Sequence, residues 1–216
     1  MSAAVPPSLS RSLLLFAALY GGMTCIAGVL GAKQVALGPL AVEAGIFPFL
    51  LLVVISSTTA ELHGATAAQM LVRFGFVPLI TAMLLIALVI RLPTDPGMYA
   101  PAIPAFPIVL GQSARMMLSG VVAYGVSQSL NVLLFTRLSQ TAGRGLAIRG
   151  AVASALSQVV DTVIFISLSF LGERPIGALM AGQMLAKVVL SLLLVPPLIH
   201  LLAAVGRAID GEHARD

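Results

Sequence analysis

Long apolar stretches with very few charged residues dominate this chain, and they restrict its fold more than any other feature. A helix that crosses the hydrocarbon core of a bilayer needs about 20 predominantly apolar residues. The sequence therefore predicts an all-α, polytopic membrane protein, a single domain over residues 1–216. The six predicted transmembrane helices cover approximately residues 12–31, 45–61, 70–91, 109–136, 150–171 and 177–204.

The overall composition agrees with this fold class and excludes several functions. Of the 216 residues, 59% are hydrophobic and only 9% are charged, whereas about a quarter of the residues of a soluble domain are charged. The net charge of +4 comes from scattered basic residues, so we expect the lipid bilayer, and no nucleic acid, as a partner. Cys25 is the only cysteine, which excludes an intramolecular disulfide and a cysteine-based metal cluster. We predict no metal and no cofactor.

Proline, glycine and charged residues separate the apolar stretches. The longest break holds five prolines between Pro93 and Pro107, and we expect it to be a loop without a helix of its own. Lys and Arg near span ends favour the cytoplasmic side. The inner side would carry Arg11, Arg73, Arg137, Arg144, Arg149, Arg207 and Arg215, and the outer side Lys33, Arg91 and Arg174. This asymmetry predicts that both termini lie in the cytoplasm.

A polar frame, S-Q-x-x-(N/D)-x-x-x-F, occurs in two consecutive apolar stretches, as SQSLNVLLF and SQVVDTVIF. Residues three apart share one face of a helix, so Gln128 lies beside Asn131, and Gln158 lies beside Asp161. Each glutamine is nine residues from the basic residue at the inner end of its span. At ~1.5 Å of rise per residue, both lie about 13 Å from the inner face. We therefore expect the two frames to face each other or one shared cavity.

Asp161 lies near the middle of its predicted span, where an ionised group costs about 2.5–3.5 kcal/mol on insertion scales. Lys187 lies at a matching depth in the last span and is its expected partner, with Gln183 one turn away on the same face. Arg115 lies just inside the outer end of the fourth span, and Glu61 closes the inner end of the second. The density of these polar groups favours a ligand or ion pathway over purely structural contacts between helices.

Paired amides and a carboxylate suit a flat, polar heterocycle. A carboxylate accepts two parallel N–H bonds, and an amide can donate and accept along one edge of a ring. A guanine-like ring offers such an edge, and a buried carboxylate would reject rings that lack the donors.

Four segments resemble, in order, the successive signatures of the queuosine-precursor transporter family, also described as the vitamin-uptake-transporter family. They are FPFLLLV…STTAELHG, ARMMLSGVVAYGVSQSLNVLLFTRL, SALSQVVDTVIFISLSFLG and GQMLAKVVLSLLLVPP, between Phe47 and Pro197. The resemblance implies a six-helix importer in the inner (plasma) membrane. Its substrates would be 7-cyano- or 7-aminomethyl-7-deazaguanine, which are salvaged to make queuosine in tRNA.

The match to this family is close at some site positions and departs at others. Asp161, Gln158, Arg115 and Lys187 fit the pattern that the resemblance implies, and so does Glu61. Ser57 and Asn131 stand where members of the family tend to carry Asp. Two carboxylates of the usual set are thus replaced by neutral groups.

The sequence leaves the energy source and the partners open. No G-x-x-x-x-G-K-(S/T) motif occurs, so the chain is not itself a P-loop ATPase. It acts alone or as the substrate-binding subunit of an energy-coupling-factor system. Small residues four apart in the first span let helices approach closely and could dock a coupling subunit or a second copy. These pairs are Ala17/Gly21, Ala18/Gly22 and Gly28/Ala32.

An intramembrane enzyme is the remaining alternative. A serine protease would need a serine beside a histidine, and the candidates are Ser113 and His200. Their depths put them roughly 25–30 Å apart. We therefore predict a protein that is not an enzyme.

Overall fold

The computed structural model describes residues 10–38, 40–111, 114–140, 145–172 and 175–211. Ser113 of the enzyme alternative lies outside these ranges. So do Arg144, Arg174 and Arg215, which contribute to the predicted orientation.

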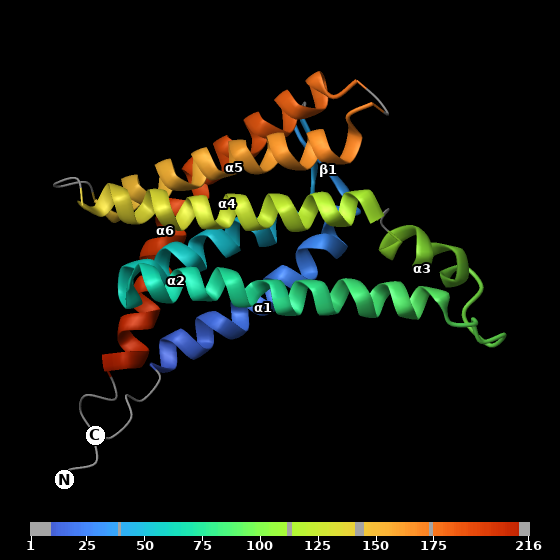
Figure 1. The fold of residues 1–216 in the computed structure, drawn as a ribbon, viewed down its shortest axis with the longest axis horizontal. Coiled ribbons are helices and arrows are strands. Elements are labelled where there is room, and N and C mark those ends of the chain that lie inside the picture. The colour runs from blue at the N-terminus through green and yellow to red at the C-terminus, as the bar shows by residue number, and fades with distance from the viewer. Residues whose placement is uncertain (1–9, 39, 112–113, 141–144, 173–174, 212–216) are drawn as a thin grey trace, which may run out of the picture.

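The described residues form mainly helices, and five of these are long and apolar enough to cross a membrane. This confirms a helical, multi-pass membrane protein (Figure 1). The five are α1 (Arg11–Gly31), α2 (Ile46–Arg91), α4 (Ala114–Gln140), α5 (Leu146–Phe170) and α6 (Gly177–Gly211).

The helix α2 contains both the second and the third predicted spans. The expected break between these spans, at the ELHG segment, is present but consists of one residue, since only Gly64 departs from helical geometry, with φ 85° and ψ 165°. This backbone conformation is essentially confined to glycine, which has no Cβ to collide with the chain. Figure 1 shows α2 turning back at this point, so that a first leg before Gly64 and a second leg after it run in opposite directions.

The proline-rich break contains a short helix, α3 (Ala102–Leu110), so the prediction of a loop without a helix is wrong. Pro101 is the N-cap residue and Pro104 lies in the first turn. The backbone N–H groups of a first turn have no partner within the helix, so proline removes nothing there. Because α3 ends at Leu110, the following long helix begins at Ala114 rather than at residue 109.

A two-stranded hairpin joins α1 to α2, which the all-α prediction did not include. The strands β1 (Gln34–Leu37) and β2 (Leu40–Glu43) pair antiparallel, with Gln34 opposite Glu43. Gly38 has φ +60° at the first position of the two-residue turn, where tight hairpins favour glycine. The hairpin brings Glu43 to the start of α2, beside the cavity described below.

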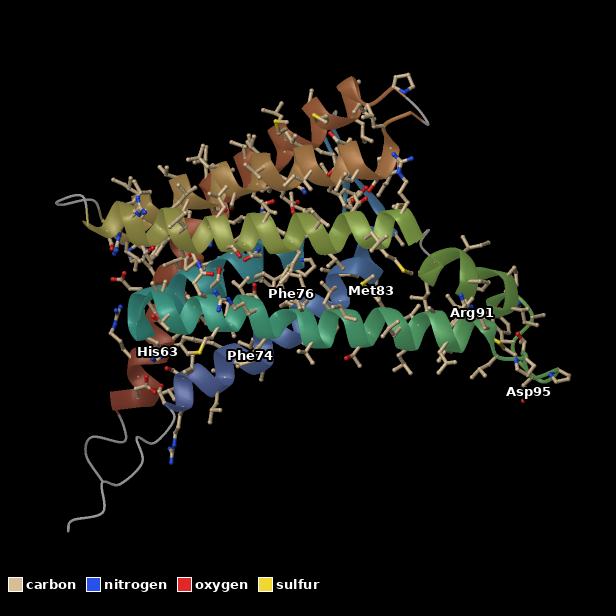
Figure 2. All side chains as sticks on the ribbon, viewed as in Figure 1. His63, Phe74, Phe76, Met83, Arg91 and Asp95 are labelled. Carbon is tan, nitrogen blue, oxygen red and sulfur yellow. The ribbon has the colours of Figure 1, made fainter. Side chains whose placement is uncertain are left out.

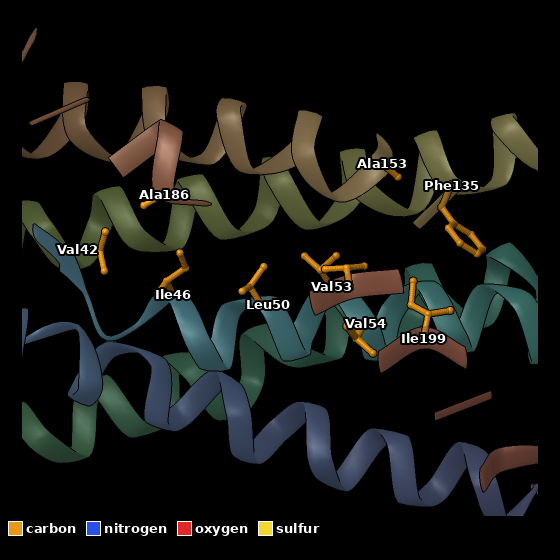
Figure 3. Packing of buried hydrophobic residues seen from close by; sticks show 10 residues of the cluster. Val42, Ile46, Leu50, Val53, Val54, Phe135, Ala153, Ala186 and Ile199 are labelled. Carbon is orange, nitrogen blue, oxygen red and sulfur yellow. The ribbon is translucent and has the colours of Figure 1, made fainter. Parts of the chain in front are cut away.

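Buried apolar side chains pack the first leg of α2 against α4, α5 and α6 (Figure 3). The cluster consists of Val42, Ile46, Leu50, Val53, Val54, Phe135, Ala153, Ala186, Val195 and Ile199. Large apolar side chains also cover the outside of the bundle. Phe74, labelled in Figure 2, and Leu84 are 68% and 67% exposed, as suits a surface solvated by lipid tails.

The beginning of α1 and the end of α6 are joined by hydrogen bonds. The hydroxyl groups of Ser10 and Ser12 donate to the Asp210 carboxylate at 2.8 Å and 2.7 Å. His63, which precedes the reversal of α2, lies 2.8 Å from the Ser12 hydroxyl through its Nε2 atom. We call this part of the bundle the Gly64 end, and the opposite part, with the hairpin and α3, the hairpin end.

Candidate functional site

Asp161 and Lys187 form an ion pair inside the bundle. The Nζ atom of Lys187 lies 2.8 Å from Oδ2 of Asp161, and the two residues are only 9% and 4% exposed. Ser127 on α4 donates a hydrogen bond of 3.1 Å to the other carboxylate oxygen. The expected pairing is therefore present, and one carboxylate links three helices.

The ion pair forms part of the wall of a cavity of about 170 Å³ near the hairpin end. Most of the wall is apolar and comes from α1, both legs of α2, α4 and α5, with Met83 of Figure 2 among its residues. Three aromatic residues, Phe49, Tyr124 and Phe165, also line it. The ammonium group of Lys187 lies 5.8 Å from the centre of the Phe49 ring. Apolar walls with a few fixed polar groups are typical of sites for small organic ligands.

A second group of buried polar side chains connects α4 to the first leg of α2. The amide nitrogen of Asn131 donates to the hydroxyl oxygens of Ser56 and Ser57 at 3.1 Å and 3.0 Å. The Ser56 hydroxyl also lies 3.4 Å from the side-chain oxygen of Gln128. Ser57 and Asn131, the two positions at which this chain departs from the pattern described above, are thus hydrogen-bonded to each other.

Several buried polar atoms lack a hydrogen-bond partner among the described residues. They include both amide atoms of Gln158, Nε2 of Gln128, Oδ1 of Asn131, and the hydroxyl oxygens of Thr58, Ser154 and Ser191. Each such atom costs about 1–3 kcal/mol, and side chains that only hold helices together would be expected to satisfy one another. This arrangement favours polar groups that meet water or a ligand at some stage.

The predicted site residues separate into groups. Asp161 and Lys187 line the cavity, while Gln128, Asn131 and Gln158 are fully buried and are not among the residues that line it. Gln183 is also buried, one turn before Lys187 on α6.

Arg115 and Glu61 lie apart from the cavity. The Arg115 guanidinium donates to the backbone carbonyls of Leu168 and Leu171 at the end of α5, at 2.6 Å and 2.8 Å. Glu61 pairs with Arg149 at 2.8 Å near the Gly64 end. Neither residue is among those that line the cavity.

Two tyrosines and a serine belong to the polar network but were missing from the predicted set. The Tyr124 hydroxyl donates to the Val72 carbonyl at 2.9 Å and lies 3.1 Å from the Tyr20 hydroxyl. Ser127 holds Asp161, and its place as the first residue of the repeated frame was a signal that could have identified it. Tyrosines inside apolar stretches were a weaker signal, because tyrosine is also a common residue of apolar cores.

The arrangement of serine, histidine and aspartate at the Gly64 end does not correspond to a hydrolase triad. The Asp210 carboxylate accepts from Ser12, whereas in a serine hydrolase the carboxylate binds the histidine that activates the serine. His200, the histidine of the enzyme alternative, forms a hydrogen bond with the Pro196 carbonyl oxygen. Within the described ranges, no group of three His, Cys, Asp or Glu side chains could hold a metal ion.

Comparison with known proteins identifies a family. A family model described as "putative vitamin uptake transporter" matches residues 43–201, most of the chain. This region contains the ion pair and the buried amides. No curated protein matches the chain, and no solved structure matches it.

Proposed function

Since this chain belongs to the vitamin-uptake-transporter family, we propose that it imports 7-cyano- or 7-aminomethyl-7-deazaguanine across the inner (plasma) membrane. The observation that carries the proposal is the buried ion pair in the wall of a mostly apolar cavity. A neutral heterocycle with donors and an acceptor along one edge matches a carboxylate beside an ammonium group. The imported precursor would be used to make queuosine in tRNA.

The proposed ligand pose follows from the atoms that line the cavity. The N–H groups of the ring would donate to Asp161, and Lys187 would donate to the ring carbonyl oxygen. The faces of the ring would pack against the aromatic residues of the wall, among them Phe49 and Phe165. As the ligand moves toward the Gly64 end, the side-chain amides of Gln128 and Gln158 would form hydrogen bonds with the polar edge of its ring.

The test is uptake in a host that can neither synthesise nor import 7-deazaguanines. Each precursor is supplied at low concentration, and queuosine in tRNA is measured with the wild type and with Asp161→Asn at matched expression. The proposal expects modification with the wild type and loss of it with the variant. A well-expressed wild type that restores no queuosine would rule out this substrate.

Cys25 offers a binding assay that does not depend on transport. It is the only cysteine of the chain and lines the same cavity. A bound 7-deazaguanine should slow alkylation of its thiol in the purified protein, and adenine should not. Equal rates with and without 7-deazaguanine would show that the compound does not occupy the cavity.

We further propose that the two legs of α2 cross the bilayer separately, which makes six crossings with both termini in the cytoplasm. Single cysteines in place of Ala65 and Asp95, in a Cys25→Ser background, test this topology. An impermeant thiol reagent should reach position 65 only from the cytoplasm and position 95 only from outside. If α2 crossed once, position 95 would react from the cytoplasm.

A partner that docks on α1 remains a proposal, either a coupling subunit of an energy-coupling-factor system or a second copy of this chain. Ala18 and Gly22, one turn apart, are exposed, and no described residue of another element lies within 4 Å of a Cβ built on Gly22. Their small surface is therefore not used for packing within the bundle. Ala18→Leu should leave uptake unchanged if the chain acts alone, and should abolish it if a partner docks at this position.

A further inference from the structure

Among the described residues, those that line the cavity lie between the hairpin end and the ion pair, and none lies farther toward the Gly64 end. Asp161 is the residue of α5 nearest to the Gly64 end that lines the cavity. The next turns of α5 carry Gln158 and Ser154, both fully buried, and α6 carries the buried Ser191 one turn beyond Lys187. A transported ligand would have to pass these residues.

Gln158, Ser154 and Ser191 together form what we call the inner polar file. Four of their side-chain atoms lack hydrogen-bond partners in the described structure. Gln158 and Ser154 are one helical turn apart on α5 and share a face. Buried polar groups without partners are suited to a passage that holds water or ligand in another conformation.

An apolar plug and an ion pair close the file toward the Gly64 end. Phe135, Ala153 and Ile199 belong to one buried cluster (Figure 3), and Ala153 directly precedes Ser154 of the file. The Arg149 guanidinium lies over the Phe135 ring, 5.0 Å from its centre, and binds the Glu61 carboxylate at 2.8 Å.

The exposure of this ion pair places it at the boundary of the bundle. The side chains of Arg149 and Glu61 are 11% and 28% exposed. Arg149 is five residues before Ser154 on α5, which corresponds to about 7.5 Å along the helix axis. The pair therefore covers the last stretch between the inner polar file and the surface.

We propose that Glu61 and Arg149 form the gate at the Gly64 end of the transport path. In the closed gate, the Arg149 guanidinium rests against the Phe135 ring. The gate joins α5 to the first leg of α2, just before the reversal at Gly64. Separation of the two charges would free the end of that leg and uncover the inner polar file. This inference rests on the proposed transport function, but its test needs no substrate.

The test measures how fast a charged, impermeant methanethiosulfonate reagent reacts with one cysteine in protein held in lipid nanodiscs. The reporter is Ser154→Cys in a Cys25→Ser background, and Glu61→Gln opens the gate. The reaction at position 154 should accelerate about tenfold, the factor expected for loss of one hydrogen bond between charged groups. Native Cys25, measured with Glu61→Gln alone, should react at an unchanged or lower rate, because it lies in the cavity near the hairpin end.

Matched variants separate gating from loss of folding. Asp95→Asn removes an acidic group near the hairpin end and should leave the rate at position 154 unchanged. Glu61→Arg combined with Arg149→Glu should restore slow labelling. Should that double variant fail to fold, Arg149→Gln must reproduce the effect of Glu61→Gln.

Two results would contradict the proposal that Glu61 and Arg149 form a gate. One is an unchanged rate at position 154 in folded Glu61→Gln protein. The other is equal acceleration at positions 154 and 25, which would indicate general loosening of the bundle. Neither result depends on which compound the protein carries, so failure of the gate and failure of the proposed substrate remain distinguishable.

Discussion

The carboxylate of Asp161 on α5 lies 2.8 Å from the ammonium group of Lys187 on α6, and both residues are at least nine-tenths buried. Two opposite charges in contact make a pair that is neutral overall, so the bundle interior avoids an isolated charge. The same pair presents one acceptor group and one donor group to the cavity. Stability and ligand binding therefore depend on the same two side chains, and the first prediction separates them.

Lys187→Met should destabilise the protein by about 3–5 kcal/mol, because it leaves a buried carboxylate without a counter-charge. Asp161→Asn combined with Lys187→Met removes both charges and should recover most of the stability without restoring uptake. Thermal unfolding of the purified proteins in detergent, together with the uptake assay, checks both expectations. A Lys187→Met protein as stable as the wild type would contradict the first expectation, and a double variant no more stable than Lys187→Met would contradict the second.

Ser127→Ala removes the hydroxyl that donates to Asp161 at 3.1 Å. We expect on the order of tenfold weaker binding, because the carboxylate is then less firmly oriented. Ser139→Ala is the control, since Ser139 lies on the same helix, donates to the Thr136 carbonyl and does not line the cavity. Ligand protection of Cys25 measures both variants, and identical affinities would refute the role of Ser127.

Gly64→Ala should lower stability by about 1–3 kcal/mol, because alanine rarely adopts the positive φ of this position. No heavy atom of the described residues lies within 4 Å of a Cβ built there, so the loss would come from the backbone alone. Gly22→Ala is the control, an exposed helical position where alanine should stabilise by up to about 1 kcal/mol. Equal melting temperatures for both variants would disprove the argument.

Gly75→Ala should destabilise the protein, because the new methyl group would collide with the hydroxyl of Tyr124 and the ring of Tyr20. Such overpacking costs about 1–3 kcal/mol. Tyr124→Phe removes the atom nearest to the collision, so the double variant should lose less stability than the sum of the two single losses. Chemical denaturation of all four proteins measures this coupling, and simple additivity would contradict it.

Much of the fold and part of the site could be predicted from the sequence. Span positions followed from hydropathy, because lipid tolerates only apolar helix exteriors. The partnership of Asp161 and Lys187 followed from depth alone, since the rise of a helix per residue is constant. The pairing of Glu61 with Arg149 could not be predicted, because depth gives the position of a residue along the membrane normal but not the helix that its side chain faces.

The sequence by itself determined that this chain is a helical membrane protein and which of its polar residues lie deep in the apolar layer. Both conclusions depend on local quantities, namely transfer free energy and helical rise. Only the tertiary structure decided that Ser127 holds Asp161, that Asn131 contacts Ser57, and that Glu61 binds Arg149. These contacts depend on how each helix is rotated about its axis, which is set by packing with residues far away in the sequence.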